Sequence, residues 1–183
     1  MLTAIRDQFW KAGYTATSVS DLMRVTGLGK GSLYAAFGDK HRLFLRVLQD
    51  YVDTGHAALR RRLLTTPRAV DALHAYLTNP AAEGAERGCF MANSTSELAT
   101  LDDDVRERSR QTYAERVRIV AEGVARAQEQ GDLSLSLDPA TLAAELVAAQ
   151  QGIVFLGRAG MDIDQLRATA TRLADRLIER IAA

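Results

Sequence analysis

The stretch from Thr17 to Leu43 constrains the fold of this chain more than any other, because it predicts two short helices joined by a tight glycine turn. Ser18 can cap the first helix, since its hydroxyl can accept a hydrogen bond from an unpaired amide at the helix start. Gly27 stands where that helix must end in a left-handed residue. The apolar spacing then predicts a second helix over Lys30–Phe37. This arrangement indicates a helix-turn-helix, which places its second helix in the DNA major groove.

Two further helices flank this pair. The segment Leu2–Ala12 carries apolar residues at helical spacing, and Gly13 ends it. A longer helix is predicted from Asp39 to Arg62. The chain begins almost within the first of these helices, so we expect no N-terminal arm to reach the DNA minor groove. Together these elements predict a DNA-binding domain over residues 1–46.

The remaining residues, 47–183, predict a second domain made of helices alone. Three prolines in 183 residues, with abundant Ala, Leu, Arg and Glu, favour long helices over sheet. Apolar spacing and helix-start signals place these helices at 69–77, 89–98, 102–130, 138–157 and 162–182, with a loop over 79–88. The sequence therefore predicts an all-α protein in which a helix-turn-helix module precedes a larger helical body.

The charge distribution distinguishes the two predicted domains. The net charge of the chain is zero, but residues 1–50 hold seven Lys or Arg against four Asp or Glu, and all three lysines lie there. A basic module on an acidic body suits a site-specific DNA-binding protein. The sequence contains no uninterrupted apolar run of ~18 residues and no signal peptide, and its one cysteine cannot form an internal disulfide. We therefore expect a cytoplasmic protein without a membrane partner.

The second helix of the pair predicts a set of DNA contacts. Lys30 can bind a phosphate or a guanine edge, and Ser32 can donate a hydrogen bond to a phosphate or a base. Thr17 and Ser18 stand at a helix N-terminus, which suits a phosphate, although Ser18 can also serve only as a cap. The residues expected to face the groove are small or cationic: Gly29, Lys30, Gly31, Ser32, Ala35 and Ala36.

The residues and spacing of this region resemble the TetR family of bacterial transcriptional regulators. The resemblance covers about the first quarter of the chain, and it implies that Tyr34 and Lys40 contact backbone phosphates. Two features depart from the family's pattern: Gly29, where many relatives have Ser or Thr, and Ala35-Ala36, where relatives have aromatic or polar residues. Direct reading of bases is therefore expected to be sparse. The matching residues are Phe9, Gly13-Tyr14, Thr17-Ser18-Val19, Gly27-Leu28, Gly31-Ser32-Leu33-Tyr34, Phe37, Lys40 and Leu43-Phe44.

The resemblance also implies what the helical body does. TetR proteins usually enclose a small-molecule pocket between central helices, and they dimerise through their last two helices, here near 138–157 and 162–182. Residues that mix apolar walls with a few polar groups are the candidates for this pocket, and each can equally be ordinary core. These candidates are Tyr51, Tyr76, Cys89, Phe90, Met91, Asn93, Tyr113, Gln150 and Phe155.

Cys89 has two open interpretations. It lies near a predicted helix N-terminus and follows Arg87 closely, and both features favour the reactive thiolate. The segment RGCFMANSTSEL is also similar to that of a TetR subgroup that includes electrophile and oxidant sensors. A buried, inert cysteine is the alternative, and the sequence leaves both open.

The sequence indicates a regulator rather than an enzyme. His41, His56 and His74 are scattered without metal-ligand spacing, and no glycine-rich phosphate loop appears, so we expect neither a metal nor a cofactor. The DNA-binding pattern and the resemblance together imply a homodimeric repressor on a palindromic operator in double-stranded DNA, which a small-molecule or electrophile effector releases. The alternative is a helical dimer that binds a ligand or a protein and has lost operator recognition.

Overall fold

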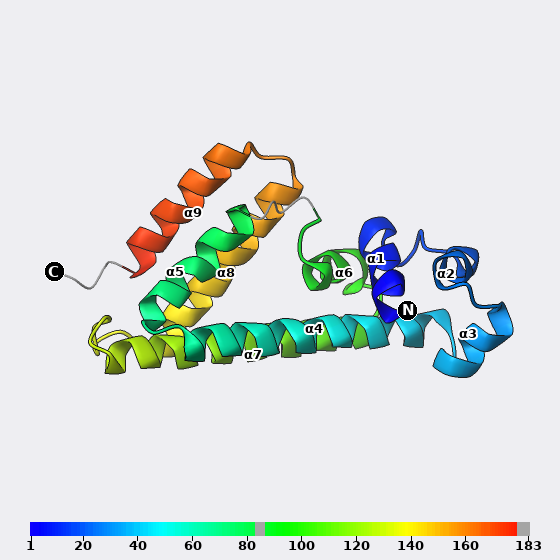
Figure 1. Ribbon diagram of the computed structural model, residues 1–183, viewed down its shortest axis with the longest axis horizontal. Coiled ribbons are helices and arrows are strands. Elements are labelled where there is room, and N and C mark those ends of the chain that lie inside the picture. Colours follow the sequence, from blue (N-terminus) through cyan, green and yellow to red (C-terminus); the bar gives the residue numbers. More distant parts are fainter. Residues whose placement is uncertain (83–86, 179–183) are drawn as a thin grey trace. The chain divides into compact units, whose positions relative to one another are not determined.

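The computed structural model describes residues 1–82 and 87–178, and helices are the only regular secondary structure in those residues (Figure 1). The predicted all-α class is therefore confirmed. The helices are α1 (Leu2–Ala12), α2 (Val19–Thr26), α3 (Lys30–Phe37), α4 (Lys40–Thr65), α5 (Ala69–Ala82), α6 (Phe90–Leu98), α7 (Asp103–Glu129), α8 (Pro139–Arg158) and α9 (Ile163–Ile178).

The helices belong to two compact units. The first unit contains Met1–Thr54 and Phe90–Arg110, and the second contains Gly55–Cys89 and the chain from Gln111 onward. Helices α4 and α7 therefore contribute residues to both units. Because α6 and the first turns of α7 pack with the N-terminal helices, this division differs from a single boundary after residue 46. The functional boundary at that residue stays a prediction.

The core of the first unit joins α1 to the helix-turn-helix and to the start of α4. Ile5 and Phe9 of α1 are almost completely buried. The ring of Phe9 lies edge-on to that of Phe44 on α4, with their centroids 5.2 Å apart. Burying a side chain of this size stabilises the folded state by about 1.5–3 kcal/mol. The short helices α2 and α3 are thus fixed to a packed base by Leu22 and Leu33, which are also buried.

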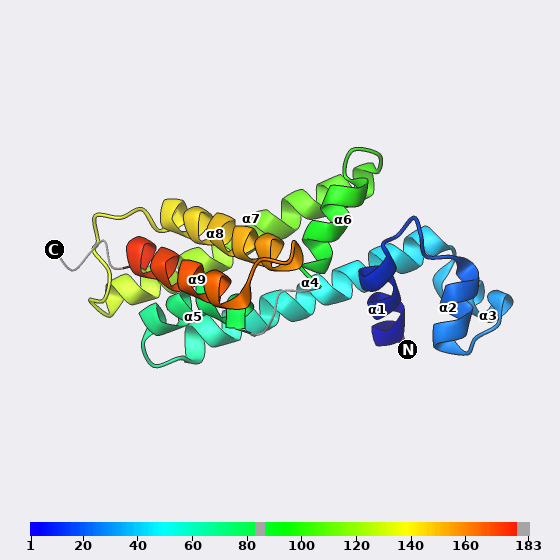
Figure 2. The ribbon, with the colours of Figure 1, turned by 90° about the horizontal axis from the view of Figure 1, so that it is seen from above.

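The second unit is built around a larger apolar cluster. Helices α5, α8 and α9 lie side by side in two perpendicular views (Figures 1 and 2). Their buried residues meet those of the adjoining parts of α4 and α7. The cluster includes Leu63, Leu73, Val120, Leu146 and Leu166, all at most 1% exposed.

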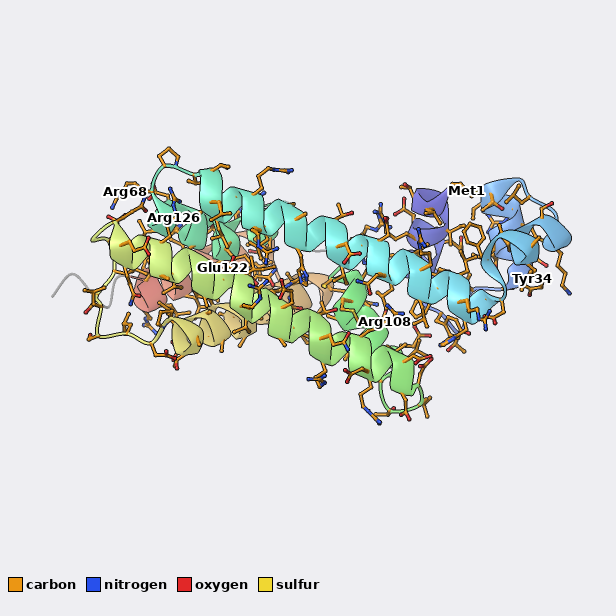
Figure 3. The ribbon with its side chains drawn as sticks, turned by 90° about the horizontal axis from the view of Figure 1, so that it is seen from below. Met1, Tyr34, Arg68, Arg108, Glu122 and Arg126 are labelled. Carbon is orange, nitrogen blue, oxygen red and sulfur yellow. The ribbon has the colours of Figure 1, made fainter. Side chains whose placement is uncertain are left out.

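Helix α4 ends three residues later than predicted, at Thr65 rather than Arg62. The Arg126 guanidinium of α7 binds this helix end. It donates hydrogen bonds to the carbonyl oxygens of Leu63, in the last turn of α4, at 2.9 Å and of Thr66, just after the helix, at 2.8 Å. Helix ends leave carbonyl groups without intrahelical partners, and a cation there is favourable. Figure 3 labels Arg126 near this end of α4. Local sequence does not carry this signal, since Arg126 lies 60 or more positions away.

Helix α5 also continues past its predicted end at Leu77, and it contains Pro80. The loop predicted over 79–88 is therefore wrong for residues 79–82, whereas 83–86 lie outside the described residues. Proline removes one hydrogen bond of a helix interior. Tertiary packing offsets that loss here, because Tyr76, Leu77 and Ala81 on the same segment are buried.

Helix α8 is long and apolar enough, by length and composition alone, to cross a membrane. It begins as predicted, since Asp138 accepts the backbone N–H of Thr141 at 2.8 Å and Pro139 occupies the first turn. Much of its apolar surface, including Leu146 and Ile153, lies in the core of the second unit. Core helices of globular proteins have the same composition, and the packing of α8 fits that interpretation.

Candidate DNA-binding and effector sites

Local hydrogen bonds fix α2 and α3 in the helix-turn-helix arrangement. Ser18 Oγ accepts the backbone N–H of Asp21 at 3.1 Å, and the Asp21 carboxylate accepts the backbone N–H of Ser18 at 3.0 Å, which forms a capping box. Gly27 has a left-handed backbone with φ of 71°, and its N–H bonds to the Met23 carbonyl at 2.9 Å. The predicted cap at Ser18 and turn at Gly27 are both confirmed.

One side of α3 is anchored and the other is exposed. Leu33 is 1% exposed and holds the helix to the core, while Tyr34 is half-buried beside it. The Lys30 ammonium lies 5.8 Å from the centre of the Tyr34 ring, whose position Figure 3 labels. Such an arrangement leaves the opposite side of the helix open to a groove of DNA. The exposed residues are the ones predicted to face the groove: Gly29, Lys30, Gly31, Ser32, Ala35 and Ala36.

Thr17 and Ser18 occupy different environments. Thr17 is fully buried, and its hydroxyl donates a 2.6 Å hydrogen bond to the Gly13 carbonyl. Its side chain is therefore not presented to DNA as predicted, because it stabilises the turn between α1 and α2. Ser18 is exposed, but its hydroxyl donates to the Asp21 carboxylate at 2.6 Å. The cap is the role that these contacts support for Ser18.

Lys40 lies in the first turn of α4 with its ammonium group 4.3 Å from the centre of the Tyr14 ring. A cation over an aromatic face is attracted by the ring electrons. Burial lowers the pKa of Lys40, and the negative charge of Glu97 opposes that effect. The contact holds Lys40 beside the turn that leads into α2, where a phosphate is expected.

Glu97, in the last turn of α6, binds the turn that follows α1. Its two carboxylate oxygens accept the backbone N–H groups of Tyr14 at 3.0 Å and Thr15 at 2.8 Å. Burial disfavours the charged carboxylate, but the amide hydrogen bonds and the Lys40 charge outweigh it, so the pKa of Glu97 is lowered from its usual value. Gly13 makes this approach possible, because a Cβ atom there would lie 2.8 Å from Glu97 Oε2.

His41 forms a second long-range contact in the same unit. Its Nε2 atom lies 2.7 Å from Asp102 Oδ2, while Asp102 Oδ1 accepts the backbone N–H of Val105 at the start of α7. One potential ligand atom from each of His41, Asp102 and Asp104 lies within 4.8 Å of the others. Sequence spacing did not indicate this grouping, because His41 and Asp102 are 61 positions apart. Asp102 already binds His41 and caps α7, so these contacts support a structural role in which Asp102 joins the start of α4 to the start of α7.

Four of the predicted effector residues, Tyr51, Phe90, Met91 and Asn93, lie in the first unit. Tyr51 and Phe90 have ring centroids 5.7 Å apart, and Trp10 lies 5.1 Å from Tyr51 and 5.9 Å from Phe90. Phe90 is 2% exposed, so it belongs to an aromatic core. Asn93 is half-buried on α6. Trp10 packs into the same group of rings.

The other five lie in the second unit, and three of them, Tyr76, Cys89 and Tyr113, cluster. Tyr76 and Cys89 are each 7% exposed, and Cys89 interacts electrostatically with both Tyr76 and Tyr113. Gln150, buried on α8, accepts a 2.6 Å hydrogen bond from Gln151. The side chain of Tyr113 donates a long hydrogen bond, 3.4 Å, to Gln151 Oε1. Met91, which follows Phe90 in the first unit, is fully buried.

Phe155 does not line an interior site within this chain. It lies on α8 with 70% of its surface exposed. The prediction placed it among the apolar walls of the pocket. The helix turns this residue outward, opposite the face that carries Ile153 into the core.

Two family descriptions match the chain. "Bacterial regulatory proteins, tetR family" matches residues 1–47, and "Tetracyclin repressor-like, C-terminal domain" matches residues 61–173. The second match alone covers more than half of the sequence. The protein belongs to the TetR family. Members of the TetR family regulate transcription, so the chain is a regulator and not an enzyme.

Several TetR-family relatives are similar over most of their length. The transcriptional repressor ComR of Escherichia coli K12 is 30% identical over 179 residues, which cover 93% of this chain and 85% of ComR. The repressor DhaR of Mycobacterium sp. GP1 is 27% identical, over 80% of this chain and 74% of DhaR. A cysteine mutant of the regulator CifR, complexed with 26-base-pair operator DNA, has a TM-score of 0.81 at 26% identity, and the match covers 94% of this chain and 93% of that one.

A solved structure of reduced E. coli NemR has a TM-score of 0.85 at 19% identity, over 94% of this chain and 92% of NemR. This likeness shows the TetR fold.

The sequence did not predict the contacts of Glu97 and His41, because their partners lie 61 to 83 positions away along the chain. The glycine at position 13, followed directly by an aromatic residue, was the one local sign that something approaches this turn closely.

Proposed function

We propose that this TetR-family protein is a homodimeric, cytoplasmic repressor that binds a palindromic operator in double-stranded DNA. In this proposal residues 1–46 bind DNA, while residues 47–183 dimerise and bind an effector. The exposed side of α3 carries the proposal, because small residues and Lys30 stand clear of the protein there on a helix anchored by buried Leu33.

The exposed residues of α3 suit close contact with a DNA groove. Lys30 supplies a charge for a phosphate or a guanine edge, and Ser32 supplies a hydroxyl. Gly29 and Gly31 would meet no heavy atom of the protein within 4 Å even if they carried a Cβ, so the backbone is open on that side. Ala35 can contact a thymine methyl group. Tyr34 and Lys40 add phosphate contacts at the two ends of this surface.

The exposed face of α8 supports dimerisation. Ala144, Ala148 and Gly152 are exposed at four-residue spacing, and exposed Phe155 follows on the same side. Small residues allow close helix packing, and an aromatic side chain supplies buried area at an interface. With α9 beside it, α8 forms a four-helix interface with its copy. A two-fold dimer presents two α3 helices to half-sites about 34–36 Å apart, or a multiple of that distance.

An effector releases the repressor if it favours a form of the dimer whose recognition helices no longer match the half-sites. Tyr76, Cys89 and Tyr113 are the candidate contacts in the second unit. Cys89 immediately precedes α6, and α6 ends at Glu97, which holds the turn between α1 and α2. A displacement at the start of α6 therefore has a direct covalent path to the DNA-binding helices. Whether Cys89 itself reacts or only packs is decided by the alkylation test below.

A gel-shift titration with DNA flanking its own gene tests the proposal. We expect specific binding in the range of about 10⁻⁸ to 10⁻¹¹ M at physiological salt, at least ~10³-fold tighter than binding to a random duplex of equal length. Equal affinity for both duplexes would favour the alternative, a helical dimer without operator recognition. The observation in favour of that alternative is the pair Ala35-Ala36, which offers no hydrogen bond to a base.

A further inference from the structure

The second unit gathers hydrogen-bond donors around Cys89. Tyr76 comes from α5, Tyr113 and Arg116 come from α7, and Cys89 directly precedes α6. Tyr113 and Arg116 are three residues apart, so they share one face of their helix. Interactions with Arg116 affect both tyrosines, which places its guanidinium near the two hydroxyls.

The two tyrosine hydroxyls in this group can form further hydrogen bonds. Tyr76 is only 7% exposed, and its buried hydroxyl oxygen has no hydrogen-bond partner among the described residues. Tyr113 makes a single long bond, 3.4 Å, to Gln151. Buried polar groups in native proteins are normally hydrogen-bonded, and an exception requires an explanation. A bound ligand that accepts a hydrogen bond from the Tyr76 hydroxyl would explain this exception.

The charges around the hydroxyls define what kind of ligand would bind. Burial raises the pKa of Tyr76 to about 12, although the positive charge of Arg116 acts in the opposite direction. Burial likewise raises the pKa of Tyr113, with the nearby Cys89 as a second cause. Both hydroxyls are therefore protonated donors at neutral pH. Two O–H donors and a guanidinium complement a carboxylate, which Arg binds in a planar, two-point geometry.

The surroundings of the cluster are apolar. Tyr76 belongs to the hydrophobic cluster of the second unit, together with Leu73, Leu77 and Val147, and the partly buried Tyr113 packs against that cluster. Apolar walls favour a ligand with a carbon skeleton over a strongly hydrated inorganic ion.

We infer that Tyr76, Tyr113 and Arg116 bind the carboxylate of a small organic acid beside Cys89, and that such an acid is the effector class. The assignment of effector rests on the proposed repressor function, whereas the binding site itself does not. Held by its carboxylate, the acid places its carbon chain next to the only thiol of the protein. An acid with an electrophilic carbon would then be positioned for attack by the Cys89 sulfur.

Two small alkylating reagents test this inference in the full-length protein. Iodoacetate carries the carboxylate and iodoacetamide is its neutral isostere, and in both the thiolate sulfur displaces iodide to form a C–S bond while the thiol proton passes to solvent. The measured quantity is the iodoacetate-to-iodoacetamide rate ratio at Cys89, divided by the same ratio for N-acetylcysteine. We expect this normalised ratio to be about ten or more, which is the effect of one close charge in a partly buried site.

Matched variants show whether the selectivity comes from the cluster. Arg116→Gln should return the normalised ratio to about one, and Tyr76→Phe should lower it several-fold. Arg118→Gln removes the same charge from the same helix, but Arg118 is exposed and paired with Glu115 and Glu122, so the ratio should not change. Circular dichroism checks folding. If Arg116→Gln does not fold, Tyr76→Phe, which loses only a hydroxyl, carries the test.

Three results would overturn the inference: a wild-type ratio equal to that of the free thiol, a Cys89 that reacts with neither reagent until the protein unfolds, or equal losses in Arg116→Gln and Arg118→Gln. Operator binding by the untreated protein is measured separately. A selective Cys89 in a protein that binds no operator would support the carboxylate site and contradict the proposed repressor function.

Discussion

The Glu97 carboxylate accepts the backbone N–H of Tyr14 at 3.0 Å, although the two residues are 83 positions apart in the sequence. This contact joins the last turn of α6 to the turn between α1 and α2. Its second oxygen accepts the next amide of the same turn, that of Thr15, at 2.8 Å. The start of α6 follows Cys89 directly, so a single short helix connects the candidate effector residues to the DNA-binding module.

Replacing Glu97 with Ala should weaken both folding and DNA binding. Two backbone amides lose a charged acceptor, and hydrogen bonds to charged groups contribute about 1.5–3 kcal/mol each, of which partial solvent access recovers a share. We expect a loss of ~2 kcal/mol in the free energy of unfolding by urea denaturation, and weaker operator binding. Ser96→Ala, a change at the exposed neighbouring position, is the control. Equal effects of the two substitutions would contradict the importance of the carboxylate.

Gly13→Ala should destabilise the protein by about 1–3 kcal/mol or more. Its φ of 82° and ψ of 170° lie in a region that is essentially restricted to glycine. The added Cβ would also stand 2.8 Å from Glu97 Oε2 and displace it. Gly55→Ala is a matched control in the interior of α4, where the added Cβ meets nothing within 4 Å; it should stabilise by about 0.5–1 kcal/mol. Thermal unfolding of both variants measures the contrast, and a neutral Gly13→Ala would exclude the proposed strain.

The capping box of α2 predicts a specific pH dependence. Hydrogen bonds from the Ser18 side chain and then from Arg24 lower the pKa of Asp21 to about 2, against ~3.9 in an unfolded chain. A carboxyl group with a depressed pKa in the folded state adds stability above pH ~4 and loses it as the pH falls toward 2. Asp21→Asn should therefore be less stable than the wild type at pH 7, and the difference should shrink below pH ~4 and vanish only below pH ~2. A difference that stays constant over this range would contradict the role of the charge.

Lys40→Ala should weaken binding to every DNA sequence alike and lower the slope of log affinity against log salt concentration by about 0.9. The reason is the loss of one phosphate contact near Tyr14. Lys11→Ala removes the same charge from the exposed last turn of α1 and should leave the slope nearly unchanged. Fluorescence anisotropy titrations at several salt concentrations provide the comparison. Identical slopes for Lys40→Ala and the wild type would remove Lys40 from the interface.

Phe155→Glu should convert the dimer to a monomer and abolish operator binding, since a charge buried at an apolar interface without a partner is strongly unfavourable. Phe155 is exposed in the single chain, so the substitution should leave the fold of the monomer intact. Leu135→Glu, at a residue 82% exposed in the segment before α8, is the control and should remain dimeric. Light scattering at micromolar concentration distinguishes the outcomes. A dimeric Phe155→Glu would place the interface elsewhere.

Local chemistry was enough to predict the helix-turn-helix. Ser18, Gly27 and the apolar spacing of Lys30–Phe37 act over three or four residues, and the structure reproduces the cap, the turn and the helix bounds. The extension of α5 through Pro80 was not predictable in this way, because buried neighbours from other helices compensate for the lost hydrogen bond. Long-range contacts also decide the end of α4, where Arg126 binds the carbonyl groups.

The candidate site shows the same limit. The exposed residues of α3 follow from the helical period, but the burial of Thr17 depends on a hydrogen bond to Gly13 that composition does not reveal. Glu97 and His41 gain their roles from partners more than 60 positions away. The separation of Tyr51 and Phe90 from Tyr76 and Tyr113 likewise depends on which helices pack into which unit.

Hydroxyl-radical footprinting of the protein on DNA flanking its own gene tests the central claim most directly. A dimer that presents two α3 helices should protect two patches related by two-fold symmetry, with centres one helical turn or a multiple of it apart, ~34–36 Å per turn. A single protected patch, or two patches without symmetry, would contradict a dimeric repressor that reads a palindrome through α3.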